Sequence, residues 1–474
     1  MTGGIVAQQR CEMNYAMQSK HYGIDRYLLW ILLGGLILRI ALFMIAQPWT
    51  PKGEDTILHG SRDSLSYHYL AHDLVIYGRY GGNSYADPEN LDPAIRPLGY
   101  ALFLAFWYWL FAPRIWIPLL VQIALSTASV YLVYRIVQMM ASLPAARFAA
   151  FLYAVYPNAI LHANSIMTEV LYNFFALTAV YFWARFHLQQ QASLRSLLML
   201  AGLAALFVGL GVYVRVASMY IALATVILLA VLAPVLVKRQ RLWVGLTAIA
   251  VLIFTLMPYS LFMYSNYGTF QLTITDAYNM LLNTVGHSIV GRKGRLDPDV
   301  REIKMQLRRE LNALYQEAGI DPINSSPFER ARYFRKLALK YYREQPMTIL
   351  TGSLAGMARL WLLPDRIGEI ADEVLPKRVP LGGVIVLAAY SVAIVHLLVL
   401  LGLVVLGIPQ AYRAQRHFFW LFLLVVLYAT LTSNAAGNDW YRMQAAPVLF
   451  PMAAIGYEVF ARRRTAEIEH VSQG

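Results

Sequence analysis

Two acidic side chains have positions suited to proton transfer. Asp63 opens a segment in which Tyr67 follows at helical spacing, and Glu169 follows Thr168 at the start of an apolar run. Each acid also has a simpler explanation as a cap or first-turn residue that satisfies free backbone amides. Two acids at the same mouth of a helical bundle nevertheless make a suitable general-base site. We therefore take Asp63 and Glu169 as the candidate catalytic residues.

Three arginines stand at the same level of the predicted bundle. Arg96 precedes an apolar helix expected over 98–112, Arg215 separates two apolar runs, and Arg442 follows Tyr441. A single arginine there could simply extend toward lipid headgroups. Three on one face favour a phosphate pocket, because a guanidinium binds phosphate in bidentate fashion. The aromatic residues predicted to line that pocket are Tyr67, Tyr100 and Tyr441.

The elements that must position these residues are membrane-spanning helices. Of the 474 residues, 58% are hydrophobic and 14% are charged, more apolar surface than a soluble chain of this length can bury. The apolar residues form runs of about 20, the length that crosses a bilayer. The ten expected spans are 27–47, 114–140, 145–166, 169–187, 195–213, 216–237, 242–264, 381–409, 417–434 and 441–461.

Basic residues in short loops predict the orientation of these spans. They cluster in alternate loops, at 135–147, 185–195, 238–241 and 413–416, and again at 462–464 after the last span. Such loops stay in the cytoplasm, so both termini are expected inside and the candidate site outside, on the periplasmic face of a bacterial inner membrane. The charge of +13 suits anionic lipid or phosphate. It does not indicate nucleic acid, because many of the basic residues flank spans.

We predict an all-α polytopic bundle of about 10–11 spans in three parts. Residues 1–264 form an N-terminal catalytic module with a first outer loop at 48–113. Residues 265–380 form an outer region with basic helices over 299–317 and 327–343, and 381–474 supply the last spans. The apolar segment 347–363 is expected to lie at the interface, because an additional span would invert every later loop.

Four ordered motifs give the chain a family resemblance. They are Asp63-x3-Tyr67-x3-Ala71 with Gly78-Arg79-Tyr80, then Arg96-Pro97-Leu98-Gly99-Tyr100, then Tyr156-Pro157 with Met167-Thr168-Glu169, and finally Tyr441-Arg442 with Pro447. In these motifs the chain resembles the GT-C membrane glycosyltransferases, in particular the protein mannosyltransferases and lipid A aminoarabinose transferases. It departs from many members at Ser64, where they carry a second acid beside the first.

The resemblance implies a sugar donor carried on a polyprenyl phosphate and an extracytoplasmic active site. Asp63 matches the first-loop catalytic acid of the family, Arg96 a residue that contacts the donor phosphate, and Glu169 a second acid. The acceptor implied is a glycan, a lipid or a protein. A single base opposite arginines predicts one displacement, which inverts the anomeric carbon.

Other interpretations of the sequence predict different chemistry. His68 and His72 have a spacing that can bind zinc, so a divalent metal is possible, although at 100° per residue they point away from Asp63 and no metal ligand is assigned. A flippase or transporter of lipid-linked glycans would carry its ionisable groups near the middle of the bilayer. A non-catalytic assembly protein would tolerate replacement of Asp63. A nucleotide-binding fold is not indicated, because neither G-x-G-x-x-G nor a P-loop is present.

Overall fold

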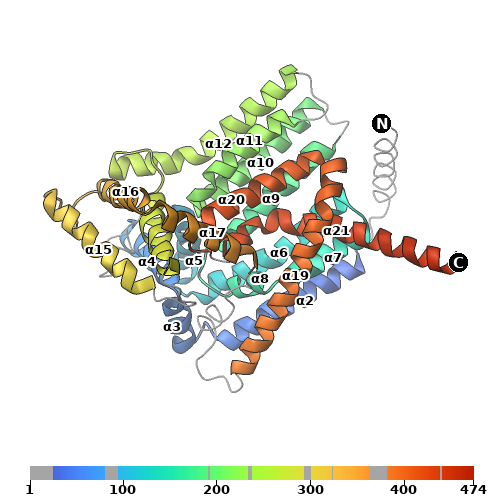
Figure 1. Ribbon diagram of the computed structural model, residues 1–474, viewed down its shortest axis with the longest axis horizontal. Helices are drawn as coiled ribbons and strands as arrows, with labels where there is room; N and C mark the ends of the chain where they lie inside the picture. Colours follow the sequence, from blue (N-terminus) through green and yellow to red (C-terminus); the bar gives the residue numbers. More distant parts are fainter. Residues whose placement is uncertain are drawn as a thin grey trace.

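The computed structural model describes residues 25–80, 94–189, 193–232, 238–292, 300–322, 324–362, 382–437 and 440–473. Within these ranges the regular structure is helical (Figure 1). The membrane-type helices are α2 (Arg26–Ala46), α6 (Trp116–Met140), α7 (Leu143–Ala154), α8 (Pro157–His162), α9 (Glu169–Leu188), α10 (Leu194–Val214), α11 (Met219–Val231), α12 (Lys238–Tyr267), α19 (Gly382–Ala414), α20 (Arg416–Ser433) and α21 (Trp440–Gln473). The others are α3 (Pro51–Gly60), α4 (Arg62–Tyr77), α5 (Leu98–Phe111), α13 (Thr275–Tyr278), α14 (Gly286–Arg292), α15 (Val300–Glu317), α16 (Pro327–Glu344) and α17 (Pro346–Leu362), with a 3₁₀ turn at Val216–Ser218 and a π-helix at Asn279–Val285.

The helical membrane fold is as predicted. Among the described residues, six helices are long and apolar enough to cross a bilayer, namely α2, α6, α10, α12, α20 and the part of α19 from Tyr390. Three shorter apolar segments, α5, α7 and Val216–Val231, accompany them. The helices expected over 98–112, 299–317, 327–343 and 347–363 correspond to α5, α15, α16 and α17. Residues 233–237 of one expected span and 363–380 of the outer region lie outside the described residues.

One expected span differs from the structure. The segment 145–166 is divided into α7 and α8, which are separated at Val155 and Tyr156. Pro157 explains the break, because it has no N–H to donate and its ring clashes with the preceding turn. The freed carbonyl of Ala154 accepts a hydrogen bond from Nη1 of Arg39, at 3.0 Å, in the neighbouring helix α2. The break lets the chain turn at 163–168 and place Glu169 at the start of α9.

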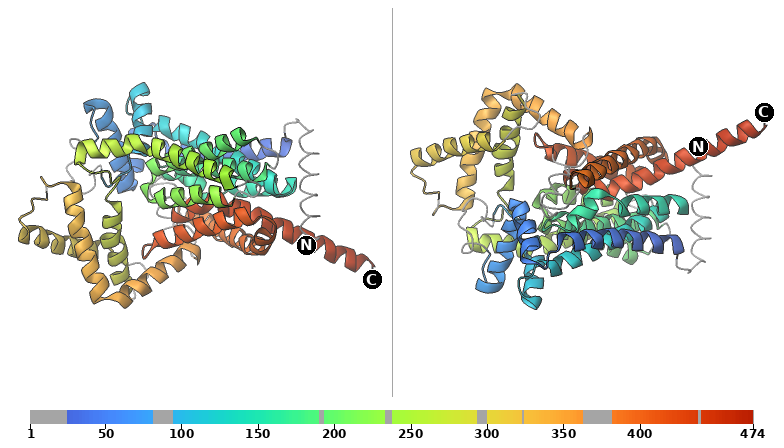
Figure 2. Two further views of the ribbon diagram at one scale, coloured as in Figure 1. Left: turned by 90° about the horizontal axis from the view of Figure 1, so that it is seen from above. Right: turned by 90° about the horizontal axis from the view of Figure 1, so that it is seen from below.

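The two ends of the bundle differ in character. In both views of Figure 2, α15 and α16 lie at one end and the C-terminal end of α21 lies at the other. At the end with the C-terminus, the Arg147 Nε lies 2.9 Å from Oδ2 of Asp25, and the Ser142 amide donates to Glu458 at 2.5 Å. The predicted basic loop 135–147 therefore lies at this end, beside the part of α21 that precedes the basic run 462–464. The candidate site residues lie at the opposite end.

Helices α14 to α17 form a second, smaller core beside the bundle. Its buried side chains include Leu281 and Val285 of the π-helix, Leu307 of α15 and Leu337 of α16. These apolar residues recur at helical spacing, so the polar faces of α15 and α16 are left to solvent. The residues just before this unit, Thr273 and Thr275, bond to the carbonyls of Ala94 and Ile95 in the segment that leads into α5.

Candidate active site

The first acid forms an ion pair at the surface of the site. Ser61 caps α4, its Oγ accepting from the Asp63 amide at 3.2 Å, and this places the Asp63 carboxylate in the first helical turn. Oδ1 of Asp63 accepts from Nη2 of Arg96 at 2.5 Å. The Arg96 guanidinium also lies 5.6 Å from the centre of the Tyr67 ring. The Asp63 side chain is 41% exposed, so an incoming molecule can reach its free oxygen.

The backbone before Arg96 is held from several sides. The hydroxyl of Tyr80 donates to the Arg96 carbonyl at 3.1 Å. The hydroxyl of Thr273 donates to the Ala94 carbonyl at 2.8 Å, and that of Thr275 to the Ile95 carbonyl at 2.5 Å. Residues almost 180 positions away in the sequence therefore fix the position of the arginine. Patterns of charge could not reveal these contacts, because their acceptors are backbone carbonyls.

Close packing explains the glycine that follows Arg96 and Pro97. A Cβ placed on Gly99 would lie 2.7 Å from the backbone and Cβ of Tyr213, so a larger residue would push α5 away from α10. Pro97 precedes the first residue of α5 with an extended backbone, which suits the start of a helix. The motif 96–100 thus combines an arginine with a tightly packed helix start.

The second acid forms a buried ion pair. Oε1 of Glu169 accepts from Nη1 of Arg215 at 2.6 Å, and the Glu169 side chain is only 2% exposed. The same guanidinium nitrogen donates to the hydroxyl oxygen of Thr168 at 3.2 Å. Thr168 therefore stands at the helix start without a side-chain capping bond and serves Arg215 instead. The simple capping explanation of this Thr-Glu pair is incomplete.

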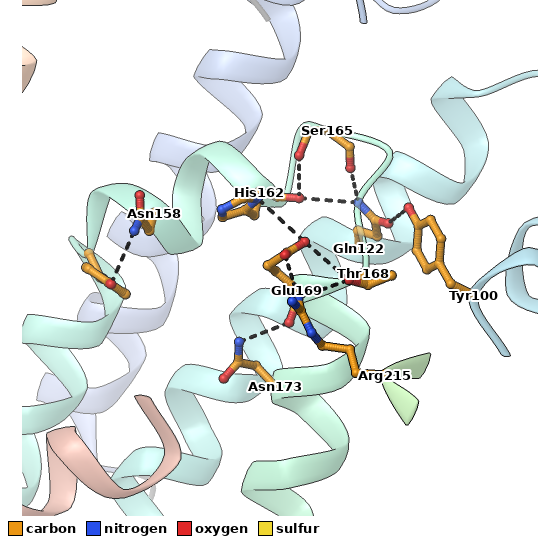
Figure 3. A network of polar contacts seen from close by, with 10 residues as sticks. Tyr100, Gln122, Asn158, His162, Ser165, Thr168, Glu169, Asn173 and Arg215 are labelled. Atoms are coloured by element: carbon orange, nitrogen blue, oxygen red, sulfur yellow. Dashed lines mark hydrogen bonds and ion pairs between the residues drawn. The ribbon is translucent and has the colours of Figure 1, made fainter. Parts of the chain in front are cut away.

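A polar network lies beside the buried pair (Figure 3). The amide of Gln122 donates to the Ser165 carbonyl at 2.8 Å and accepts from the Tyr100 hydroxyl at 2.5 Å. His162 points toward Glu169, with Nδ1 3.9 Å from Oε2. Gln122 and His162 were not predicted from the sequence, because single polar residues inside apolar helices carry no motif. Their polarity within apolar segments is the signal that could have found them.

The two ion pairs converge on Tyr67. Its hydroxyl lies within electrostatic reach of Asp63, Arg96, Glu169 and Arg215, and burial is the main cause that raises its pKa above the ordinary value. Burial disfavours the charged form of Arg96, but Asp63 more than offsets this and raises the pKa of Arg96. The pKa of Arg215 is raised in the same way by Glu169 against burial. Both arginines therefore keep their charge in the site.

The remaining predicted residues divide into two groups. Tyr100 meets the Tyr67 ring edge-to-face at 4.9 Å, and the Arg215 guanidinium lies 5.9 Å from the centre of the Tyr441 ring. Both tyrosines therefore belong to the same cluster. Arg442 is buried and donates through Nε to the Leu360 carbonyl at 2.8 Å. In this structure Arg442 ties α21 to the end of α17, and its expected contact with a donor phosphate stays a prediction.

An apolar cavity adjoins the buried pair. Its lining begins at Tyr172, one turn after Glu169, and includes Ser218, whose hydroxyl donates to the Arg215 carbonyl at 2.7 Å. The other lining residues come from α9, α10, α11, α20 and α21 and are almost all apolar: Ala176, Ala179, Val180, Trp183, Phe207, Val208, Gly211, Ile221, Thr225, Leu421, Val425, Gln444, Pro447 and Val448. The cavity reaches from Tyr172 to Trp183, three turns of α9.

The histidines considered as metal ligands have other contacts. Nδ1 of His68 lies 2.9 Å from the Tyr108 hydroxyl, and burial lowers the pKa of His68 to about 4. Nδ1 of His72 lies 3.8 Å from Asp73. Within the part of the chain that the structure describes, no three His, Cys, Asp or Glu side chains gather as a metal site would require.

Comparisons with known proteins bear on the family and the fold. Residues 95–259 match the family model of dolichyl-phosphate-mannose-protein mannosyltransferases. The structure is similar to the archaeal oligosaccharyltransferase AglB from Archaeoglobus fulgidus in complex with an inhibitory peptide and a dolichol-phosphate, with a TM-score of 0.52 and 12% identity over 95% of this chain and 52% of that one. The chain has the GT-C fold.

A second structure gives the same result. The apo form of the Archaeoglobus fulgidus oligosaccharyltransferase has a TM-score of 0.50 and 14% identity, over 96% of this chain and 52% of that chain. The chain thus spans about half the length of both structures. A comparison with curated proteins gives no match. The GT-C fold and the family match confirm the resemblance inferred from the motifs, and they support a membrane glycosyltransferase.

Proposed function

We propose that this chain transfers a sugar from a polyprenyl phosphate to an acceptor hydroxyl at the extracytoplasmic face of the membrane. The observation that carries the proposal is the convergence of two acid–arginine pairs around Tyr67, beside an apolar cavity. A lipid-linked donor needs a cation for its phosphate and an apolar channel for its chain. The family match and the dolichol-phosphate in the AglB complex support this donor class.

The roles of the charged residues follow from their exposure. Asp63 accepts the proton of the acceptor hydroxyl, because it is the acid that an acceptor can reach. The hydroxyl oxygen then attacks the anomeric carbon, and the bond from that carbon to the phosphate oxygen breaks. Polyprenyl phosphate leaves with the electron pair, and Arg96 and Arg215 stabilise the charge that builds on it. One displacement of this kind inverts the anomeric carbon.

The orientation in the membrane belongs to the same proposal. The basic loops lie at the end of the bundle opposite the candidate site, and such loops remain in the cytoplasm. The site then faces the periplasm of a bacterial inner membrane, and both termini are cytoplasmic. Labelling of single cysteines introduced at Asp55 and Arg463 with a membrane-impermeant maleimide tests this, because only the first should react from outside.

A reconstituted transfer assay tests the activity. The purified chain in nanodiscs receives radiolabelled polyprenyl-phosphate sugars, and label transferred to glycan, lipid or protein acceptors is measured. Asp63→Asn should abolish transfer, while Asp55→Asn, which alters an exposed acid of the neighbouring helix α3, should not. Equal transfer by wild type and Asp63→Asn would overturn the assignment of the base. A trapped covalent glycosyl-enzyme would overturn the single displacement.

A transport assay separates this proposal from a flippase. In proteoliposomes, a flippase moves labelled lipid-linked sugar across the bilayer without breaking its bond to phosphate. Movement of intact donor by wild type, with no sugar transferred to any acceptor, would favour the transporter.

A further inference from the structure

His162 is a buried residue whose ring lies beside Glu169 (Figure 3). Its side chain is 2% exposed, and neither ring nitrogen has a hydrogen-bond partner among the residues that the structure describes. Nδ1 lies 3.9 Å from Oε2 of Glu169, about 1 Å beyond hydrogen-bonding distance. A buried imidazole without partners is costly, so this position calls for an explanation.

The two oxygens of Glu169 are unequally satisfied. Oε1 accepts the short bond from Arg215, at 2.6 Å, whereas within the described ranges Oε2 has only the Thr168 hydroxyl, at 3.5 Å. Water cannot complete the shell of Oε2 freely, because the side chain is 2% exposed. An unpaired buried carboxylate is strongly unfavourable. His162 places Nδ1 3.9 Å from Oε2, on a ring that could donate to it after a small shift.

The proposed function gives Arg215 a second anion to bind. When the phosphate of the donor approaches Arg215, the guanidinium shares its donors between phosphate and Glu169, and the buried carboxylate loses part of its partner. A shift of about 1 Å then brings His162 into hydrogen-bonding distance of Oε2. We propose that His162 is a positioning residue, which holds Glu169 in place while Arg215 binds the donor phosphate.

The surroundings of His162 suit this role. Its carbonyl and that of Ser165 accept from the amide of Gln122, at 3.4 and 2.8 Å, so the end of α8 is anchored to α6. At the other end of the break, Arg39 holds the Ala154 carbonyl. Neither anchor involves Arg215. His162 therefore stays beside Glu169 whatever Arg215 binds.

A double-mutant cycle tests the proposal without any enzymatic assay. Thermal unfolding in detergent is measured for Arg215→Met, His162→Phe and the double variant, and for the same set in the Glu169→Gln background. We expect the double variant to lose at least about 2 °C more than the sum of the single losses, because each substitution removes one of two alternative partners of one carboxylate. The excess should vanish in Glu169→Gln, where no charge is left to pair.

Conservative variants and a neighbour provide the controls. His162→Gln and His162→Asn keep an amide that can donate to Oε2, so the excess loss should shrink relative to His162→Phe. Asn158→Ala is the matched control, because Asn158 is fully buried one turn earlier on α8 and bonds to Tyr156. It should combine with Arg215→Met additively. Additive losses for His162→Phe would overturn the proposal, whether or not the chain transfers sugar.

The kinetic arm rests on the proposed function. We expect His162→Phe to raise KM for the polyprenyl-phosphate donor by about tenfold, the size of a lost hydrogen bond to a charged group, with KM for the acceptor unchanged. His162→Gln should restore the donor KM. Binding of farnesyl phosphate to the same variants should weaken in parallel. A normal donor KM in His162→Phe, with wild-type transfer intact, would overturn the positioning role while leaving the proposed function in place.

Discussion

The Asp63–Arg96 pair and the Glu169–Arg215 pair are built alike but surrounded differently. Each joins one carboxylate to one guanidinium, at 2.5 and 2.6 Å, and each guanidinium lies 5.6 to 5.9 Å from a tyrosine ring. Asp63 belongs to a helix outside the bundle and is 41% exposed. Glu169 opens a bundle helix and is 2% exposed. The same two residue types therefore meet very different dielectric environments.

This difference in exposure suggests that the two acid–arginine pairs have different roles. An exposed carboxylate can exchange its arginine for a substrate at a lower cost, because water compensates the charge of the carboxylate. A buried carboxylate cannot lose its partner without a large penalty. We infer that the first pair opens during the reaction. In the second pair Glu169 stays in place, with His162 as a further partner while Arg215 binds the phosphate.

The largest expected effect is the loss of activity when either acid is replaced, and the change in stability should then distinguish the two acids. Asp63→Asn should lower kcat by about 10²- to 10⁴-fold, the usual contribution of a general base, with little change in thermal stability. Glu169→Gln should lower both activity and melting temperature, because it leaves Arg215 buried without its anion. Transfer rates and thermal unfolding in detergent measure both. A large fall in stability for Asp63→Asn alone would contradict the division of roles.

A second comparison removes the arginines. Arg215→Gln should destabilise the chain by about 3 kcal/mol, as expected when a buried pair loses one partner. Arg96→Gln should cost about 1 kcal/mol at most, because Asp63 remains solvated. Melting temperatures of the two variants, measured in the same detergent, rank these losses. Equal losses would mean that exposure does not control the strength of the pairs.

A smaller loss of stability is expected from the polar network beside Glu169. Gln122→Leu removes the acceptor of the Tyr100 hydroxyl and the donor to Ser165, and we expect a loss of about 2 kcal/mol for these buried groups. Thr127→Val on the same helix is the control, since its hydroxyl bonds only within the helix, to Ile123. Thermal unfolding should show little change there. A similar shift in both variants would point to general disturbance of α6.

The smallest expected effect comes from the hydroxyl groups that hold the backbone before Arg96. Thr275→Val removes the bond to the Ile95 carbonyl and should lower kcat about tenfold by loosening the position of Arg96, at a cost in stability near 1 kcal/mol. Ser265→Ala is the control, because this exposed hydroxyl makes only local bonds, donating to the Phe262 carbonyl and accepting from the Asn266 amide. Initial rates of sugar transfer at saturating donor are compared between Thr275→Val and Ser265→Ala. Unchanged rates in Thr275→Val would show that Tyr80 and Thr273 suffice.

The sequence predicted the helical membrane fold and most of the cluster. Asp63, Arg96, Glu169 and Arg215 were recognisable because each stands beside an apolar run, at the same end of the expected bundle. In the structure all four lie around Tyr67. Their roles in binding and catalysis stay predictions. The length of each span followed from the thickness of the bilayer, which sets helix length independently of tertiary contacts.

The rest depended on contacts that no pattern encodes. Arg442 shares the Tyr-Arg motif at the last span, yet its guanidinium bonds to the Leu360 carbonyl, a partner 82 residues away. Thr273 and Thr275 also act on backbone carbonyls, which every residue possesses. The break at Pro157 was foreseeable from the properties of proline. Its rescue by Arg39 was not, because Arg39 is isolated within an apolar segment.

Arg39 also sets an order for the assembly of the chain in the membrane. Its guanidinium bonds to Ser126 and Ala154, 87 and 115 residues later in the sequence. A helix with an unpaired arginine at its centre is costly to insert, by about 2.5–3.5 kcal/mol on translocon scales. Until α6 and α7 have been synthesised, α2 lacks the partners that stabilise it in lipid. The first span therefore reaches its final position only after α7 has formed and ended at the break before Pro157, the same break that positions Glu169.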